Sequence, residues 1–117
     1  MFKITTLLGG ISIAFLTMNA AQATDSRKVS CTGDMIEPGG LTKSPTTLTA
    51  VFSPANNVSK VSVDLGKGTV SALVLSNNTV QLRFRTKDFT GEYFHYNRDM
   101  FLIYRSGHLA RLTCAPS

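Results

Sequence analysis

The 117-residue sequence has no tryptophan, only two cysteines and only 16% charged residues. After residue 23, no apolar run is as long as the one at the start, and no stretch shows helical periodicity over a useful length. The composition is neither that of a disordered chain nor that of a collagen. A chain of this length allows one domain and makes two unexpected. These features indicate a single small globular domain without a helical scaffold.

Residues 1–23 have the layout of a secretory signal peptide. One lysine precedes an apolar stretch from residue 4 to residue 18, and the segment ends in Ala21-Gln22-Ala23, a small-x-small pattern that signal peptidases accept. About 15 apolar residues are too few to span a bilayer, which needs roughly 20. We therefore expect cleavage after residue 23 and a periplasmic or secreted domain of residues 24–117 without a transmembrane segment.

The predicted mature chain is basic, with 11 Lys and Arg residues against 7 Asp and Glu residues and a formal charge of +4. Such a charge supports a statement about association rather than about fold. An exported protein rarely meets nucleic acid, so we expect no nucleic-acid partner. The expected partners are an anionic envelope component, such as lipopolysaccharide phosphates or peptidoglycan carboxylates, or an envelope or secreted protein with an acidic surface.

The two cysteines, Cys31 and Cys114, lie near opposite ends of the predicted domain. An even number of cysteines in an exported chain favours a disulfide, and only one intramolecular pairing exists. Free thiols and an intermolecular bridge are the alternatives. Two ligands alone make no zinc site, so no metal is expected at this pair.

Alternating apolar and polar residues separated by turn signals dominate after residue 24. The alternating apolar positions are Leu48, Ala50 and Phe52, then Val61, Val63 and Leu65, then Val80, Leu82 and Phe84. The apolar run 70–75 suggests a central strand, and residues 32–46, rich in Gly and Pro, are expected to be mostly loop. Tight turns are predicted at 66–68, where Gly supplies a positive φ, and at 77–78, where Asn tolerates the left-handed conformation.

These strands predict an all-β fold, a small antiparallel meander of seven or eight strands that closes as a barrel or a sandwich. Residues 24–117 form this single domain, and the predicted disulfide joins its first strand to its last. The sequence does not decide between barrel and sandwich, and it does not give the oligomeric state.

No nucleophile motif, zinc-binding motif or phosphate loop is present. If His95 and His108 met in space, they would form a metal or base site, and the acids Asp88, Glu92 and Asp99 are of the type that hydrolyses sugars. A histidine beside a turn and a charged hairpin loop explain the same residues. We therefore expect no enzyme, no cofactor and no metal site.

A basic stripe is the first candidate binding surface. Arg83, Arg85 and Lys87 fall on one face of a regular strand, together with Gln81, and this face should meet solvent because the alternate residues point inward. Guanidinium groups offer bidentate contacts to phosphate or carboxylate groups. The alternative interpretation is a solvated outer face, with cations that discourage edge pairing.

The C-terminal hairpin around Ser106-Gly107 is the second candidate, because it places Arg105, His108 and Arg111 around a tight turn. Exposed loop tips on a rigid scaffold often carry binding residues. An aromatic group is expected to belong mainly to the core, with a ligand pocket as the alternative; it comprises Tyr93, Phe94, Tyr96, Phe101 and Tyr104.

Val-Ser-Cys-Thr-Gly at 29–33 and Leu-Thr-Cys at 112–114 flank the β-rich body. This layout resembles small exported proteins of Gram-negative bacteria, and its cysteine layout is similar to that of periplasmic inhibitors of c-type lysozyme. That resemblance implies a compact antiparallel barrel with cysteines near both ends. The family carries a Ser-Gly-x-x-Tyr-like inhibitory loop in mid-chain, whereas the one Ser-Gly here is Ser106-Gly107, followed by His108 and Leu109.

The sequence therefore predicts a non-enzymatic exported binding protein that contacts its partner through basic strand and loop residues. The alternative is a lysozyme-inhibitor-like protein that plugs an enzyme cleft with a loop.

Overall fold

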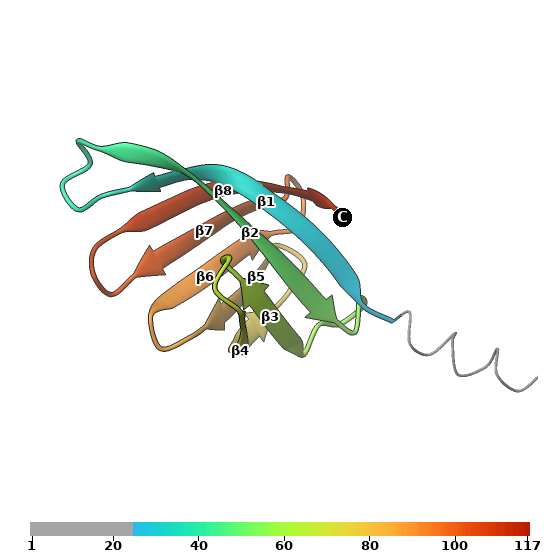
Figure 1. Cartoon of the computed structure of the whole chain (residues 1–117). Coiled ribbons are helices and arrows are strands. Elements are labelled where there is room, and N and C mark those ends of the chain that lie inside the picture. The colour runs from blue at the N-terminus through green and yellow to red at the C-terminus, as the bar shows by residue number, and fades with distance from the viewer. Residues whose placement is uncertain (1–24) are drawn as a thin grey trace, which may run out of the picture.

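The computed structural model describes residues 25–117 as one closed antiparallel β-barrel (Figure 1). The predicted signal peptide, residues 1–23, lies outside the described residues. Each strand pairs with the next along the chain, and the first pairs with the last, so the predicted all-β meander is confirmed and closes as a barrel. The eight strands are β1 (Arg27–Ile36), β2 (Lys43–Ser53), β3 (Lys60–Asp64), β4 (Thr69–Asn77), β5 (Gln81–Arg85), β6 (Phe89–Phe94), β7 (Asp99–Tyr104) and β8 (Leu109–Pro116).

Alternation along the strands fills the barrel with apolar side chains, as in other small barrels. Within residues 25–117, no polar or charged residue is buried. The largest side chains with almost no exposed surface are Tyr93, Phe52, Phe84, Leu82, Met100 and Leu102. The interior is thus a packed core rather than a ligand cavity.

The predicted disulfide between Cys31 and Cys114 is present. The two cysteines are direct partners in the register of β1 with β8, their Cα atoms are 3.9 Å apart, and both side chains are buried in the core. The bridge therefore lies at the seam where the meander closes, and it leaves no free cysteine in residues 25–117.

The expectation of a loop across residues 32–46 is wrong, because β1 continues to Ile36 and β2 begins at Lys43. Gly33 is a strand residue paired with Leu112, and a Cβ atom at Gly33 would collide with the backbone carbonyl of Arg111. The close approach of a distant strand, rather than a turn, explains this glycine.

The turns show two different mechanisms. Gly66 and Gly68 have φ angles of 99° and 109°, which confirms the turn predicted at 66–68. The turn predicted at 77–78 lies one residue later, at 78–80, because Asn77 ends β4. Neither Asn has a positive φ, so the expected left-handed conformation is wrong. Instead, the Oδ1 of Asn78 accepts hydrogen bonds from the backbone N–H groups of Val80 and Gln81, at 2.8 and 2.9 Å.

Strand β4 lies between two paired neighbours, β3 and β5, as the prediction of a central strand requires, but its outer face is uncovered. Leu73 is 59% exposed, Val70 and Leu75 are also exposed, and a register shift interrupts the pairing with β5 between Val74 and Ser76. Val80, expected to point inward, is 55% exposed. A single closed sheet has no second layer on its outside, so apolar residues that face outward stay in contact with water.

Because the strands run up and down, successive turns leave the barrel at alternate ends. One end, here called the distal end, carries the turns at 37–42, 65–68, 86–88 and 105–108. The opposite, terminal end carries the turns at 54–59, 78–80 and 95–98 and both ends of the domain. No helix within residues 25–117 is long and apolar enough to cross a membrane.

Candidate functional site

The predicted basic stripe lies on the outside of β5, with one change. Arg83 and Arg85 face outward, as alternation predicts, because the alternate residues of β5, Leu82 and Phe84, are buried in the core. The strand ends at Arg85, and Lys87 lies in the turn that follows, so the regular strand does not reach position 87 as expected. Arg85 and Lys87 are both exposed.

Arg83 differs from the other two cations because it has a carboxylate partner. Its Nε lies 3.6 Å from Oε2 of Glu92, its register partner on β6, and this Nε is buried without a hydrogen bond. The charge of Arg83 is thus largely balanced within the barrel wall. Arg85, whose register partner is Thr90, has no such neighbour.

The second predicted cluster, around the turn between β7 and β8, packs against the turn that carries Lys87. The backbone N–H of Arg105 donates a 3.0 Å hydrogen bond to the carbonyl oxygen of Asp88. The turn itself is held by a 3.0 Å bond from the N–H of Gly107 to the carbonyl of Tyr104. The structure therefore brings Lys87 and Arg105 to adjacent turns, although they are 18 positions apart in the sequence.

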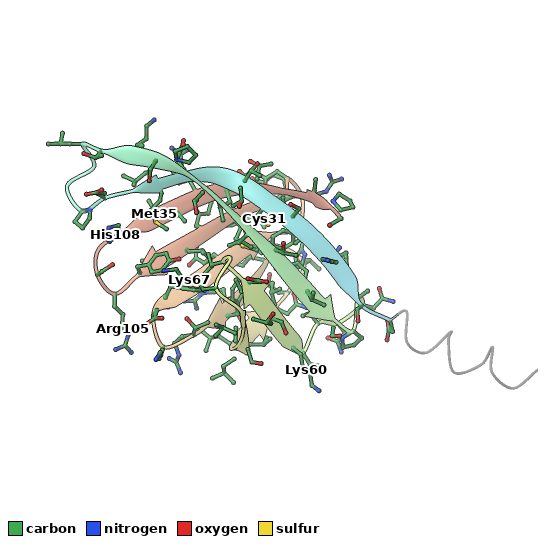
Figure 2. All side chains as sticks on the ribbon, in the orientation of Figure 1. Cys31, Met35, Lys60, Lys67, Arg105 and His108 are labelled. Atoms are coloured by element: carbon green, nitrogen blue, oxygen red, sulfur yellow. A yellow bond between two sulfur atoms is a disulfide. The ribbon has the colours of Figure 1, made fainter. Side chains whose placement is uncertain are left out.

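His108 belongs to the same turn but is tied into it. The Oγ of Ser106 and the Nδ1 of His108 are 2.8 Å apart, and the carbonyl of His108 accepts the N–H of Tyr104 at 2.9 Å. His108 is half-buried, whereas the side chain of Arg105 is exposed. Figure 2 shows Arg105 and His108 at the distal end and Lys60 at the terminal end of the barrel.

The hairpin between β1 and β2 joins this surface. A Cβ atom at Gly107 would lie 3.2 Å from Cγ of Pro38, so the proline ring sits against the β7–β8 turn. Three distal turns, at 37–42, 86–88 and 105–108, thus form one continuous chain of contacts through Pro38, Gly107, Arg105 and Asp88.

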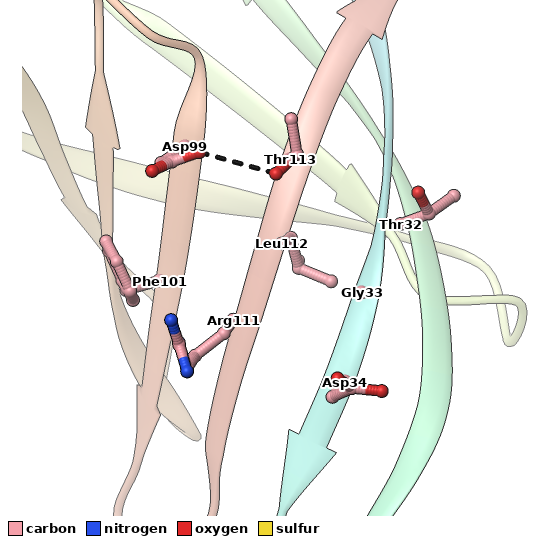
Figure 3. A pocket seen from close by; sticks show the side chains of 8 residues that line it. All are labelled: Thr32, Gly33, Asp34, Asp99, Phe101, Arg111, Leu112 and Thr113. Atoms are coloured by element: carbon pink, nitrogen blue, oxygen red, sulfur yellow. Dashed lines mark hydrogen bonds between the residues drawn. The ribbon is translucent and has the colours of Figure 1, made fainter.

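Arg111, the remaining predicted residue, lies elsewhere. It faces outward on β8, between Asp34 on β1 and Phe101 on β7, and lines a shallow depression of about 280 Å³ (Figure 3). Its side chain extends toward Phe101 and away from Asp34. Across the same depression, the Oγ1 of Thr113 donates a 3.3 Å hydrogen bond to Asp99. Arg111 is therefore not part of the cluster of distal turns.

Most basic residues of the described domain have no ion-pair partner. Among residues 25–117, Arg83 and Glu92 form the one ion pair with a separation of 4.0 Å or less, although 11 basic and 7 acidic residues are present. Unpaired cations on an outer surface keep their full attraction for an external anion. The distal end has both the unpaired cations and the projecting turns that a binding surface requires.

The two histidines do not form a joint site. His95 lies in the β6–β7 turn and His108 in the β7–β8 turn, so the length of β7 separates them. The Nε2 of His95 is 3.0 Å from Oδ1 of Asn77 at the terminal end. Burial first, and the nearby charge of Arg27 second, lower the pKa of His95 from its ordinary 6.5, against a hydrogen bond with the backbone of Asn78 that raises it.

The predicted aromatic group is split by the barrel wall. Tyr93 is buried in the core and Tyr104 is partly buried against it, whereas Tyr96 is 80% exposed. Phe94 and Phe101 face outward and form an edge-to-face pair with ring centroids 6.0 Å apart. Neither interpretation of this group is right for all five residues.

Several residues at the distal end were not singled out from the sequence. Leu41 is 95% exposed at the tip of the β1–β2 hairpin, and Ile103 is 48% exposed on β7. The pattern Gly39-Gly40-Leu41 marks a turn with an apolar residue at its tip, and it is the one sequence signal that points to Leu41. No such signal exists for Ile103, whose outward direction depends on the register.

Comparisons of the chain with protein families, with curated proteins and with solved structures found no match.

Proposed function

We propose that this protein is an exported, non-enzymatic binding protein that contacts an anionic component of the cell envelope through the basic turns at the distal end of its barrel. One observation carries the proposal. The hydrogen bond from Arg105 to Asp88 holds the turns with Arg105 and Lys87 together, and no carboxylate of residues 25–117 pairs with either cation.

Charge and geometry together support this role. Arg85, Lys87 and Arg105 are exposed and lie on or beside two adjacent turns, within reach of one anionic surface. The core behind them is fully packed and closed by the Cys31–Cys114 bridge, so the turns stand on a rigid scaffold. Arg83 and Arg111 contribute to the positive field of the outer wall rather than to the contact.

A pair of charge-matched variants tests the proposal. Lys87→Gln with Arg105→Gln removes two cations from the distal end, whereas Lys28→Gln with Lys60→Gln removes two from the terminal end. Co-sedimentation of the disulfide-bonded protein with envelope fragments should weaken in the first variant and persist in the second. If binding weakened equally in both variants, only the net charge of the protein would matter, and the proposed site would be excluded.

Salt gives a second readout. Charges on exposed turns are screened over about 10 Å at 0.1 M salt, so binding should fall steeply between about 0.05 M and 0.3 M salt. Binding that is independent of salt would contradict an electrostatic contact at these residues.

A second candidate is a lysozyme-inhibitor-like protein that inserts a loop into an enzyme cleft. The β1–β2 hairpin favours it, since this hairpin extends beyond the barrel (Figure 1) and carries an almost fully exposed leucine. The test is a cell-wall lysis assay with c-type lysozyme at two salt concentrations. Stoichiometric inhibition that resists salt would support this candidate, and the absence of inhibition would remove it.

A further inference from the structure

One row of outward-facing residues runs around the barrel next to the distal turns. The register pairs Lys43 with Ile36, Ile36 with Leu109, and Leu109 with Ile103, and the row continues on the other side to Arg85. Cross-strand partners point to the same face of a sheet, so these side chains share the outer wall. This outer rim row comprises Lys43, Ile36, Leu109, Ile103, Thr90, Arg85 and Leu73.

The outer rim row has an amphipathic composition. Three consecutive members of the row, Ile36, Leu109 and Ile103, are apolar. A cation lies on each side of them: Lys43 is the neighbour of Ile36, and Arg85 follows Ile103 with Thr90 in between. Ile103 is 48% exposed and Leu73, at the far end, is 59% exposed. The row contains no acidic residue. The next outward-facing row, which lies farther from the distal turns, contains Asp34 and Glu92.

Leu41 extends this surface beyond the barrel. It follows Gly39 and Gly40, whose φ angles of 96° and 75° turn the chain at the hairpin tip. At 95% exposure, Leu41 has no packing partner in the described domain. A single exposed leucine is unremarkable, but this one shares an end with the apolar rim and with the unpaired cations Lys87 and Arg105.

We propose that the distal end is a membrane-docking edge, in which Leu41 and the apolar rim enter the headgroup region of an anionic phospholipid bilayer while the surrounding cations bind lipid phosphates. This inference rests on the proposed function and names the lipid bilayer as the anionic component. Apolar side chains at the boundary with the acyl chains and Lys or Arg at the headgroups are the general requirements for such binding.

A bilayer fits this surface better than a protein pocket does. The apolar residues are distributed along a rim and at a separate tip, with cations between them, whereas a protein–protein contact concentrates its energy in a compact central anchor. A fluid interface can take up dispersed side chains without matching their shape. Three acids, Glu37, Asp64 and Asp88, also lie on or beside the distal turns, but five cations outnumber them: Lys43, Lys67, Arg85, Lys87 and Arg105.

The experiment measures binding of the full disulfide-bonded protein to vesicles. One vesicle contains phosphatidylglycerol and phosphatidylcholine in equal amounts, and the control vesicle contains phosphatidylcholine alone. Leu41→Ser should weaken binding to the anionic vesicle about tenfold, because one leucine side chain no longer leaves water. Tyr96→Ser, which removes an 80% exposed apolar side chain at the terminal end, is the matched control and should bind like the wild type.

Three outcomes separate this inference from the proposed function. Binding to the anionic vesicle that Leu41→Ser weakens and Tyr96→Ser preserves supports the docking edge. Binding to envelope fragments and to soluble polyphosphate, with none to the anionic vesicle or with no effect of Leu41→Ser, overturns the docking edge and leaves the proposed function standing. Binding to none of these probes overturns both. Since Leu41 is almost fully exposed, its replacement does not disturb folding, which a denaturation midpoint will confirm.

Discussion

The aromatic ring of Phe84 occupies the space that a side chain at position 91 would need. Phe84 on β5 and Gly91 on β6 are register partners that face the core, and a Cβ atom at Gly91 would collide with the edge of the phenylalanine ring. The missing side chain on one strand thus makes room for the large one on its neighbour, so the two positions together fill the narrow interior of the barrel.

We expect Gly91→Ala to lower the free energy of unfolding by about 1–3 kcal/mol, the usual cost of an added methyl group in a well-packed core. The measurement is the urea midpoint of the variant against the wild type. Thr90→Ala, a change at the neighbouring outward position, serves as the control and should have a much smaller effect. An unchanged midpoint for Gly91→Ala would mean that the ring of Phe84 moves aside at no cost.

The disulfide should contribute strongly to stability. The bridge joins two cysteines with a sequence separation of 83. For a loop of this length, the loop-entropy relation predicts a stabilisation of the folded state by about 4–5 kcal/mol. Replacing both cysteines with alanine avoids a buried free thiol and should lower the unfolding midpoint accordingly. Coincident midpoints for the oxidised wild type, its reduced form and this variant would contradict the prediction.

Acid should weaken the terminal end through His95. Burial and the charge of Arg27 lower the pKa of His95 in the folded state below 6.5, so the unfolded chain takes up this proton first. Neutral His95 therefore contributes fully to the free energy of unfolding above about pH 6.5. This contribution is lost as the pH falls from 6.5 toward the pKa of His95 in the folded state.

The test compares urea midpoints of the wild type and of His95→Gln between about pH 7.5 and pH 5.5, a range above most carboxylate titrations. Glutamine keeps a donor that can reach Asn77 but does not titrate. The wild type should lose stability on acidification, and the variant should lose less. Parallel curves for the two proteins would exclude His95 as the cause.

The pair of Arg83 and Glu92 should matter more for binding than for folding. The side chains are 40% and 27% exposed, and ion pairs of this kind contribute about 1 kcal/mol or less. Glu92→Gln should therefore change the unfolding midpoint little. The same change frees the charge of Arg83 and should strengthen binding to anionic envelope fragments at low salt, with the gain disappearing at high salt. Unchanged binding by this variant at low salt would show that the charge of Arg83 takes no part.

Turn chemistry and strand alternation were readable from the residues themselves. Gly66 and Gly68 adopt the positive φ that only glycine takes easily, and the alternation around Leu82 and Phe84 placed Arg83 and Arg85 outside. These features depend on neighbours within a few positions. The pairing of Cys31 with Cys114 was also predictable, because two cysteines allow one intramolecular bridge.

Glycines within strands were not readable in the same way. Gly33 and Gly91 look like turn residues in the sequence, but one faces the backbone of β8 and the other the ring of Phe84. Both contacts come from strands whose position is set by pairing. The turn after β4 was located to within one residue, but the hydrogen bonds that the Oδ1 of Asn78 accepts depend on a backbone geometry that asparagine alone does not specify.

By itself, the sequence determined the class of fold, the disulfide and the outward direction of Arg83 and Arg85, since local alternation and cysteine count decide these properties. Only the tertiary structure decided that the sheet closes as a barrel and that Lys87 and Arg105 lie on adjacent turns. It also decided that Lys43, Ile36, Leu109 and Ile103 form one row. The physical reason is strand register. Closure of the barrel fixes the stagger between neighbouring strands, and this stagger places residues that are distant in the chain side by side on one surface.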